Sequence, residues 1–92
     1  MPSSNDKWFI YMIRCHGGQL YTGITTDVER RFGEHQQGKG AKFLRGKQPL
    51  QLVFSEKIGN RSEALKMELT VKKLRRSEKE LLIQQGAIKL KD

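Results

Sequence analysis

Two tyrosines, an arginine, a histidine and a glutamate are the residues of this sequence best suited to chemistry: Tyr11, Tyr21, Arg31, His35 and Glu68. Together they offer phenol, guanidinium, imidazole and carboxylate groups, which can position water, neutralise an anion and bind a hard metal ion. Cleavage of a phosphodiester needs such groups, because water must be activated while charge builds on the phosphorus oxygens. The sequence shows no nucleophilic Ser, His and Asp set and no phosphate-binding GxxxxGK loop.

The two tyrosines lie in a predicted β-hairpin. Trp8 to Ile13 is an unbroken apolar and aromatic run, which is typical of a strand covered on both faces. Gln19 to Gly23 is shorter and alternates, and the segment from Cys15 to Gly18 supplies a glycine-rich turn. Cys15 is the single cysteine, so it can form no internal disulfide, and we expect an ordinary buried or turn thiol.

The arginine and the histidine lie in a predicted helix that ends near Gln37. Thr26 is the expected N-cap, and Glu29 completes a capping box. Arg31 and His35 are four residues apart and share the face that Phe32 buries. Arg30 and Glu34 are expected to point elsewhere.

A basic loop follows at residues 38–49, with its cations at Lys39, Lys42, Arg45 and Lys47. One interpretation is a solvated connection between elements. The other is an arm that contacts the phosphates of a nucleic acid, with Phe43 as its anchor or as a base-stacking residue.

Leu50 to Lys57 is the third predicted strand, added antiparallel to the hairpin. A second helix begins after Asn60, with Glu63 in a capping box, and continues to about Leu74. Glu68 points inward on this helix, opposite its solvent face. An inward carboxylate needs a positive partner, which is either a metal ion or an ion pair with Lys72 or Arg75.

A short third helix is predicted from a capping box of Ser77 and Glu80, and it ends at Gly86. The whole pattern predicts an α+β fold, a three-stranded antiparallel sheet flanked by about three helices. Residues 1–6 are expected to be disordered, 7–86 to form the domain and 87–92 to be a tail.

The charge balance points to a polyanionic partner. Lys and Arg number 18 against 10 Asp and Glu, a net charge of +8 over 92 residues. Such a balance favours nucleic acid, with DNA preferred to RNA. No apolar run approaches the roughly 20 residues of a membrane span, and no signal peptide is evident. We therefore expect a cytoplasmic monomer with no membrane partner.

Two tripeptides in the hairpin, Phe9-Ile10-Tyr11 and Tyr21-Thr22-Gly23, resemble the paired tripeptides of the GIY-YIG nuclease superfamily. Phe9 replaces the first glycine, and Thr22 replaces the middle isoleucine of the second tripeptide. The downstream spacing agrees with the family, because Arg31 lies ten residues after Tyr21, His35 lies four residues later, and Glu68 lies in the second helix. The likeness spans about residues 7–85 and is similar to small stand-alone bacterial members.

The resemblance implies a metal-dependent DNA endonuclease that uses one Mg²⁺ or Mn²⁺ ion. Glu68 would hold the metal, Arg31 would contact the reacting phosphate, and Tyr11 or Tyr21 would activate or position the water. His35 stands where relatives place a Tyr or His near the nucleophile. Structured or damaged DNA is the expected substrate, with a role in DNA repair.

Two positions depart from the pattern of relatives. Ile24 replaces a basic residue that several relatives carry after the second tripeptide, and Glu80 replaces an asparagine of some relatives. The missing groups would have to come from Lys42, Lys72 or Lys79. Two other functions therefore stay open: a module that binds nucleic acid without cutting it, and a protein-interaction adaptor.

Overall fold

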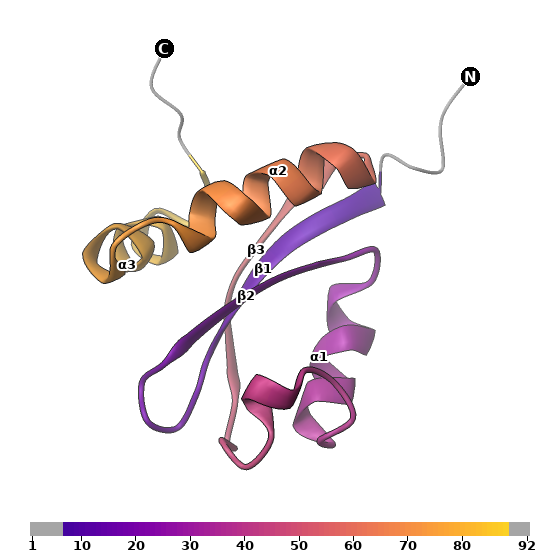
Figure 1. The fold of residues 1–92 in the computed structure, drawn as a ribbon, viewed down its shortest axis with the longest axis vertical. Coiled ribbons are helices and arrows are strands. Elements are labelled where there is room, and N and C mark those ends of the chain that lie inside the picture. The colour runs from indigo at the N-terminus through magenta and orange to yellow at the C-terminus, as the bar shows by residue number, and fades with distance from the viewer. Residues whose placement is uncertain (1–6, 89–92) are drawn as a thin grey trace.

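The computed structural model describes residues 7–88, which form an antiparallel sheet with helices on both faces (Figure 1). The elements in chain order are β1 (Trp8–Arg14), β2 (Leu20–Thr25), α1 (Val28–Gln36), the 3-10 helix η2 (Lys42–Leu44), β3 (Gln51–Gly59), α2 (Arg61–Lys72) and α3 (Arg76–Gln85). The strand order is β2-β1-β3, and both pairings are antiparallel. The predicted α+β class and three-stranded sheet are confirmed.

The central strand β1 is buried on both faces, which accounts for its unbroken apolar sequence. Tyr11 and Ile13 point to one face, where α1 and η2 pack with Phe32 and Leu44 among the contacts. Ile10 and Met12 point to the other face and contact residues of α2 and α3. Figure 1 shows this arrangement, with α1 on one side of the strands and α2 and α3 on the other.

The capping box of α2 is as predicted. The Asn60 side chain accepts from the Glu63 N–H at 2.9 Å, and the Glu63 carboxylate accepts from the Asn60 N–H at 2.9 Å. These two bonds satisfy donors that the first helical turn leaves without partners.

The predicted cap of α1 is wrong by one residue. Asp27 is the N-cap, and its carboxylate accepts from the Arg30 N–H at 3.1 Å. Asp is preferred over Thr at this position. Thr25 supports the turn, because its hydroxyl accepts from the Asp27 N–H at 3.1 Å. Thr26 and Glu29 therefore form no capping box.

The predicted box of Ser77 and Glu80 is also wrong. Glu78 accepts from the Arg75 N–H at 2.9 Å, so α3 begins at Arg76. Glu80 instead binds two arginines. Arg14 of β1 donates to both carboxylate oxygens at 2.8 Å, and Arg76 donates at 3.0 Å.

The end of the described chain packs against the sheet. Ile88, assigned to a tail from the sequence, lies against the α2 and α3 core, and its N–H donates to the Glu56 carboxylate at 2.7 Å. The predicted disorder of residues 1–6 falls outside the described residues. Among the described helices, none is long and apolar enough to span a membrane.

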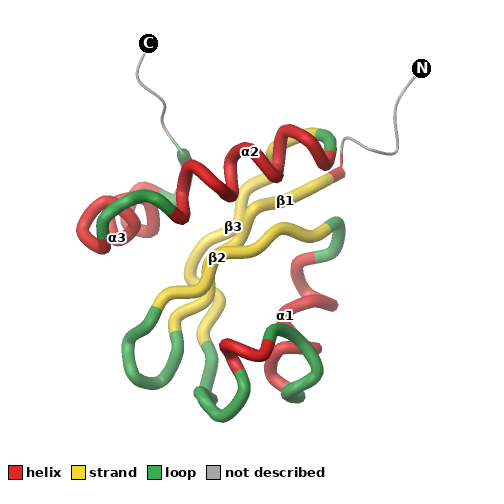
Figure 2. Tube along the Cα trace, viewed as in Figure 1, coloured by secondary structure: helices red, strands yellow, loops and turns green. Residues whose placement is uncertain are grey.

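The hairpin turn and the basic loop lie side by side at one end of the sheet (Figure 2), joined by a 3.0 Å bond from the His16 N–H to the Lys47 carbonyl. The loop has its own anchors. Leu44 is buried, and Gln48 donates to the Gln36 carbonyl at 3.2 Å. It is therefore tied to both the hairpin and α1.

Candidate active site

Strand register brings the two tyrosines together on the α1 face of the sheet. Tyr11 pairs with Gly23, and Tyr21 pairs with Ile13, so the tyrosines are diagonal neighbours on β1 and β2. Their ring centroids are 6.3 Å apart. His35 of α1 completes the cluster, with its ring centroid 5.9 Å from Tyr11 and 5.5 Å from Tyr21.

Both ring nitrogens of His35 are hydrogen bonded. The Ala41 N–H donates to Nδ1 at 3.2 Å, so the hydrogen of the neutral ring lies on Nε2, and Nε2–H donates to the Tyr11 hydroxyl oxygen at 2.8 Å. Burial lowers the pKa of His35, with a further contribution from the charge of Arg31. The imidazole is therefore neutral at pH 7 and fixed in orientation.

Tyr11 is fully enclosed, with 1% of its surface exposed. Burial raises the pKa of its hydroxyl to about 12, and the neighbouring Tyr21 adds to the rise. Arg31 opposes it by hydrogen bonding and by charge. Tyr11 is consequently a neutral phenol at physiological pH.

Two glycines leave room for these rings. A Cβ at Gly23 would lie 2.6 Å from the Tyr11 hydroxyl oxygen and 2.8 Å from Cζ. A Cβ at Gly40 would overlap the ring of His35. Gly23 belongs to the second tripeptide, whereas the sequence offered no signal for Gly40 beyond its place in a glycine-rich loop.

Arg31 lies beside the cluster, as its helical face predicted. It influences the pKa of Tyr11, and its own pKa is raised, chiefly by a hydrogen bond to Glu34. That bond joins Nη1 to the Glu34 carboxylate at 2.9 Å. Glu34 was predicted to point away from Arg31, and the bond between them shows that it does not. Its other oxygen accepts from Arg30 at 2.9 Å, so one carboxylate holds both arginines.

Glu68 is placed inward on α2, with 17% of its side chain exposed, and Lys72 pairs with it at 3.3 Å. Lys72 is one of the two ion-pair partners that the sequence predicted as alternatives to a metal ion. Within residues 7–88, no three His, Cys, Asp or Glu side chains cluster as a metal site. Glu68 also lies on the α2 side of the sheet, away from His35.

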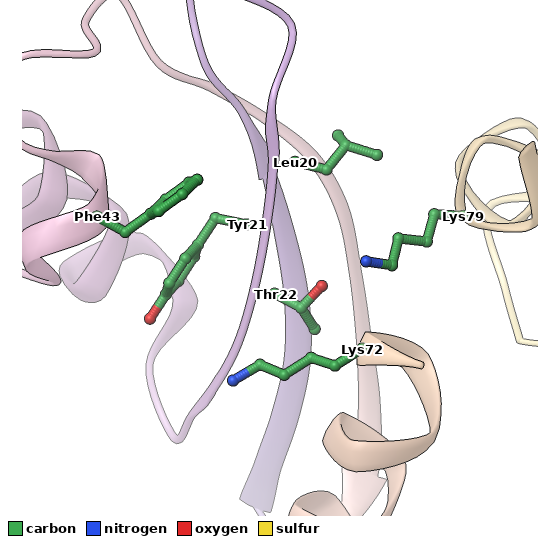
Figure 3. Close-up of a pocket in the computed structure, with 6 residues that line it drawn as sticks. All are labelled: Leu20, Tyr21, Thr22, Phe43, Lys72 and Lys79. Carbon is green, nitrogen blue, oxygen red and sulfur yellow. The ribbon is translucent and has the colours of Figure 1, made fainter. Parts of the chain in front are cut away.

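A pocket over the edge strand β2 links the two sides of the sheet. Its volume is about 240 Å³, and it is lined by Leu20, Tyr21, Thr22, Phe43, Lys72 and Lys79. Figure 3 shows the aromatic rings on one side of β2 and the two lysines reaching toward the strand from α2 and α3 on the other. Tyr21 is the member of the tyrosine and histidine cluster that reaches this pocket, and Lys72 connects the pocket to Glu68.

The cations of the basic loop divide into two groups. Lys39, Lys42 and Arg45 are exposed. Lys47 is less exposed, because its ammonium group donates to the Phe43 carbonyl at 2.6 Å and lies 4.4 Å from the centre of the Phe43 ring. Phe43 in turn stacks on Tyr21 with centroids 6.1 Å apart. The loop is thus joined physically to the tyrosine cluster.

The two departing positions have structural roles here. Ile24 packs into the core beneath α2 and α3. Glu80 is paired with Arg14 and Arg76, and the hydrogen bonds from Arg14, followed by those from Arg76, lower the pKa of Glu80 to about 2. Neither side chain supplies a cation or an amide to the pocket.

A model of the GIY-YIG catalytic domain matches residues 7–81. The chain therefore belongs to the GIY-YIG nuclease superfamily, and the resemblance based on the two tripeptides is confirmed. It is 59% identical over 80 residues to UPF0213 protein YhbQ of Escherichia coli K12, spanning 87% of this chain and 80% of that protein. A UPF0213 protein of Cronobacter sakazakii is 59% identical over 78 residues, or 85% and 82% of the two chains.

Two solution NMR structures share the fold. UPF0213 protein BH0048 from Bacillus halodurans is 42% identical, with a TM-score of 0.56 over 86% of this chain and 85% of that chain. Protein EF2693 from E. faecalis is 35% identical, with a TM-score of 0.61 over 100% and 97% of the two chains.

Proposed function

We propose that this chain is an endonuclease that hydrolyses DNA phosphodiester bonds with the help of one bound divalent metal ion. One observation carries the proposal: a tyrosine next to a fixed, neutral histidine opens into a pocket that two lysines border. This arrangement places a hydroxyl group where a polyanionic backbone would be attracted.

Tyr21 is the residue that positions the attacking water in this proposal. Tyr11 is 1% exposed, and its pKa of about 12 disfavours the phenolate needed of a base. Tyr21 is only partly buried and lines the pocket. Tyr11 and His35 then have a positioning role, since their hydrogen bond fixes the rings against which Tyr21 packs.

Arg31 is the residue proposed to contact the reacting phosphate. Its guanidinium lies close enough to Tyr11 to affect the pKa of that hydroxyl. Glu34 neutralises part of its charge and orients it through the 2.9 Å bond. A guanidinium held in this way can stabilise charge as it develops on the phosphate oxygens.

Glu68 fits the metal that the family implies. Mg²⁺ is commonly held by one or two carboxylates together with waters and substrate phosphates, so a single inward carboxylate near the pocket is a suitable ligand set. The Mg²⁺ or Mn²⁺ ion, when bound, would supply neutralisation of the charge on the phosphate. Lys72 occupies the position of a counter-ion to Glu68 in the free protein.

The charge supports nucleic acid as the substrate. A net charge of +8 and the exposed Lys39, Lys42 and Arg45 favour a polyphosphate backbone. We place DNA ahead of RNA, in keeping with the expectation from the sequence.

A cleavage assay tests the proposal. Supercoiled, branched and single-stranded DNA are incubated with the purified chain and Mg²⁺ or Mn²⁺, with and without chelator. Tyr21→Phe, purified in parallel, controls for contaminating nucleases. We expect cleavage by the wild type only, abolished by chelator. DNA binding without cleavage of any substrate would refute the proposal.

The second candidate is a module that binds nucleic acid without cutting it. Its supporting observation is the 3.3 Å pair of Glu68 and Lys72, which already satisfies the carboxylate without a metal. This function predicts that Mg²⁺ leaves the thermal stability of the protein unchanged.

A further inference from the structure

We propose that Lys72 and Lys79 form a subsite that holds a backbone phosphate of the nucleic acid next to the reacting one. The inference rests on the proposed nucleic-acid substrate, but it concerns binding and does not require cleavage. Both lysines line the pocket on the far side of β2 from the Phe43 ring (Figure 3). They come from different helices, Lys72 from the last turn of α2 and Lys79 from α3.

Lys72 is available to an incoming anion. Its side chain is 51% exposed, and its ion pair with Glu68 is long, at 3.3 Å. Because the lysine end of the pair is half exposed, water screens the attraction and weakens the pair. A phosphate can therefore share or take over this ammonium group at small cost. Its release would also free the Glu68 carboxylate to act as a ligand.

Lys79 makes no ion pair with any described residue, although it is partly buried and lies between Glu78 and Glu80 in the sequence. Both carboxylates have other partners. Glu78 accepts from the Arg75 N–H at 2.9 Å, and Glu80 is bound by Arg14 through both oxygens at 2.8 Å and by Arg76 at 3.0 Å. The two arginines thus keep Glu80 from neutralising Lys79. An ammonium group left without a carboxylate partner at the edge of a pocket is suited to an anionic ligand.

The volume of the pocket suits a single phosphate group of a nucleic-acid backbone. Its volume of about 240 Å³ is below the roughly 300 to 1,000 Å³ of sites that enclose a whole small molecule. Thr22 lies between Tyr21 and the lysines and has a hydroxyl group. A phosphate between the lysines would place its neighbour along the backbone on the side of Tyr21.

DNA binding at increasing salt tests the subsite. A fluorescein-labelled duplex oligonucleotide is titrated with protein in EDTA, so that no cleavage occurs, and the slope of log K against log salt is measured for each variant. For Lys72→Gln/Lys79→Gln we expect the slope to fall by about 0.9 if the lysines hold one phosphate, and by twice that if each holds its own. The charge-preserving Lys72→Arg/Lys79→Arg should restore it.

The matched control is Lys66→Gln/Lys73→Gln, which removes the same charge from exposed positions of α2 and its C-cap. We expect a clearly smaller change in slope. Equal changes in the test and control variants would overturn the subsite while leaving a nuclease function intact. Absence of DNA binding by the wild type would overturn both. If the wild type binds DNA but Lys72→Gln/Lys79→Gln has the same salt slope, only the subsite proposal is overturned. Thermal unfolding verifies that each variant is folded.

Discussion

At the scale of single residues, the central feature of the site is His35, whose two ring nitrogens both take part in hydrogen bonds. Ala41 and Tyr11 occupy its two nitrogens, and its lowered pKa keeps it neutral. Such an imidazole is poorly placed to accept a proton from water. In the proposed reaction, His35 would therefore act by holding Tyr11 and Tyr21 in position, through its hydrogen bond to Tyr11 and its ring contact with Tyr21.

The two tyrosines are predicted to respond differently to loss of the hydroxyl group. Tyr11→Phe leaves the buried Nε2–H of His35 without an acceptor, which should lower the free energy of unfolding by about 1 to 3 kcal/mol. Tyr21→Phe should change stability by less than about 0.5 kcal/mol but abolish cleavage. Urea unfolding and the cleavage assay, run on both variants, measure the difference. Equal stability of the two would show that the Tyr11 to His35 bond contributes little.

Replacement of Gly23 and of Gly33 by alanine should change the stability of the protein in opposite directions. Gly23→Ala forces a methyl group against the buried Tyr11 ring, and overpacking of this kind costs about 1 to 3 kcal/mol. Gly33→Ala places a methyl group within α1 where nothing lies within 4 Å, and should stabilise by up to about 1 kcal/mol. Thermal unfolding of both variants checks the signs. A neutral Gly23→Ala would mean that the Tyr11 ring can move aside freely.

Glu68→Gln separates metal binding from ion pairing. The change removes the charge that attracts Mg²⁺ and leaves Lys72, half exposed, without its partner. Without metal we expect a loss of at most about 1 kcal/mol. The melting temperature of the wild type should rise on addition of Mg²⁺, and that of the variant should not. An equal rise in both would place the metal elsewhere.

At the scale of elements, one carboxylate joins α3 to the sheet in addition to the apolar packing of Leu82 and Ile83. Glu80 connects the helix to Arg14 of β1, 66 residues away in the sequence. Arg76 extends the connection to the hairpin turn, where it donates to the Gly18 carbonyl at 2.6 Å. The position of Lys79 depends on this attachment.

The attachment of α3 should weaken in acid. The folded pKa of Glu80, about 2, lies below its ordinary value of 4.5, so its contribution to stability is full above pH 4.5 and is lost as the pH falls through about 2. The difference in unfolding free energy between wild type and Glu80→Gln should follow the same course. Urea unfolding at pH 7, 4.5, 3 and 2 measures it. A difference that does not change with pH would contradict the assigned pairing.

The sequence predicted those features that depend on local spacing. The strands, the cap at Asn60 and the shared face of Arg31 and His35 follow from periodicity and capping chemistry. The predicted cap residues of α1 and α3 are wrong because neighbouring residues can each accept the hydrogen bond of the first helical turn. In α1, Asp27 accepts this bond in place of Thr26. The bonds of Tyr11 to His35 and of Arg14 to Glu80 join distant segments, so no local pattern could predict them.

At the scale of the whole molecule, the positive charge is distributed over distinct regions. Cations extend from the exposed side chains of the basic loop beside α1 to the exposed Lys72 of α2 and the partly buried Lys79 of α3. The β2 pocket lies between the two regions (Figure 3). A nucleic acid that contacts both regions would cross the pocket that Tyr21 lines.

Replacing Lys39, Lys42 and Arg45 with Ala should weaken DNA binding similarly across sequences and lower the salt slope by up to about 0.9 per lost phosphate contact. Lys47 is left in place because it contacts Phe43. The control replaces Lys57, Lys66 and Lys73, which are also exposed. Fluorescence anisotropy at several salt concentrations provides the comparison. If the two triple variants have the same slope, the loop has no special role in binding.

Strand β2 is one of the two edge strands of the sheet, and this location has a topological consequence for the proposed substrate. A strand edge is approached from the side, so a long polymer can lie across it with both of its ends continuing into solvent. The protein would then need no free terminus to begin its reaction and could act in the middle of a chain. Covalently closed circular DNA, which has no ends to thread, is accordingly as accessible to the pocket as a linear fragment.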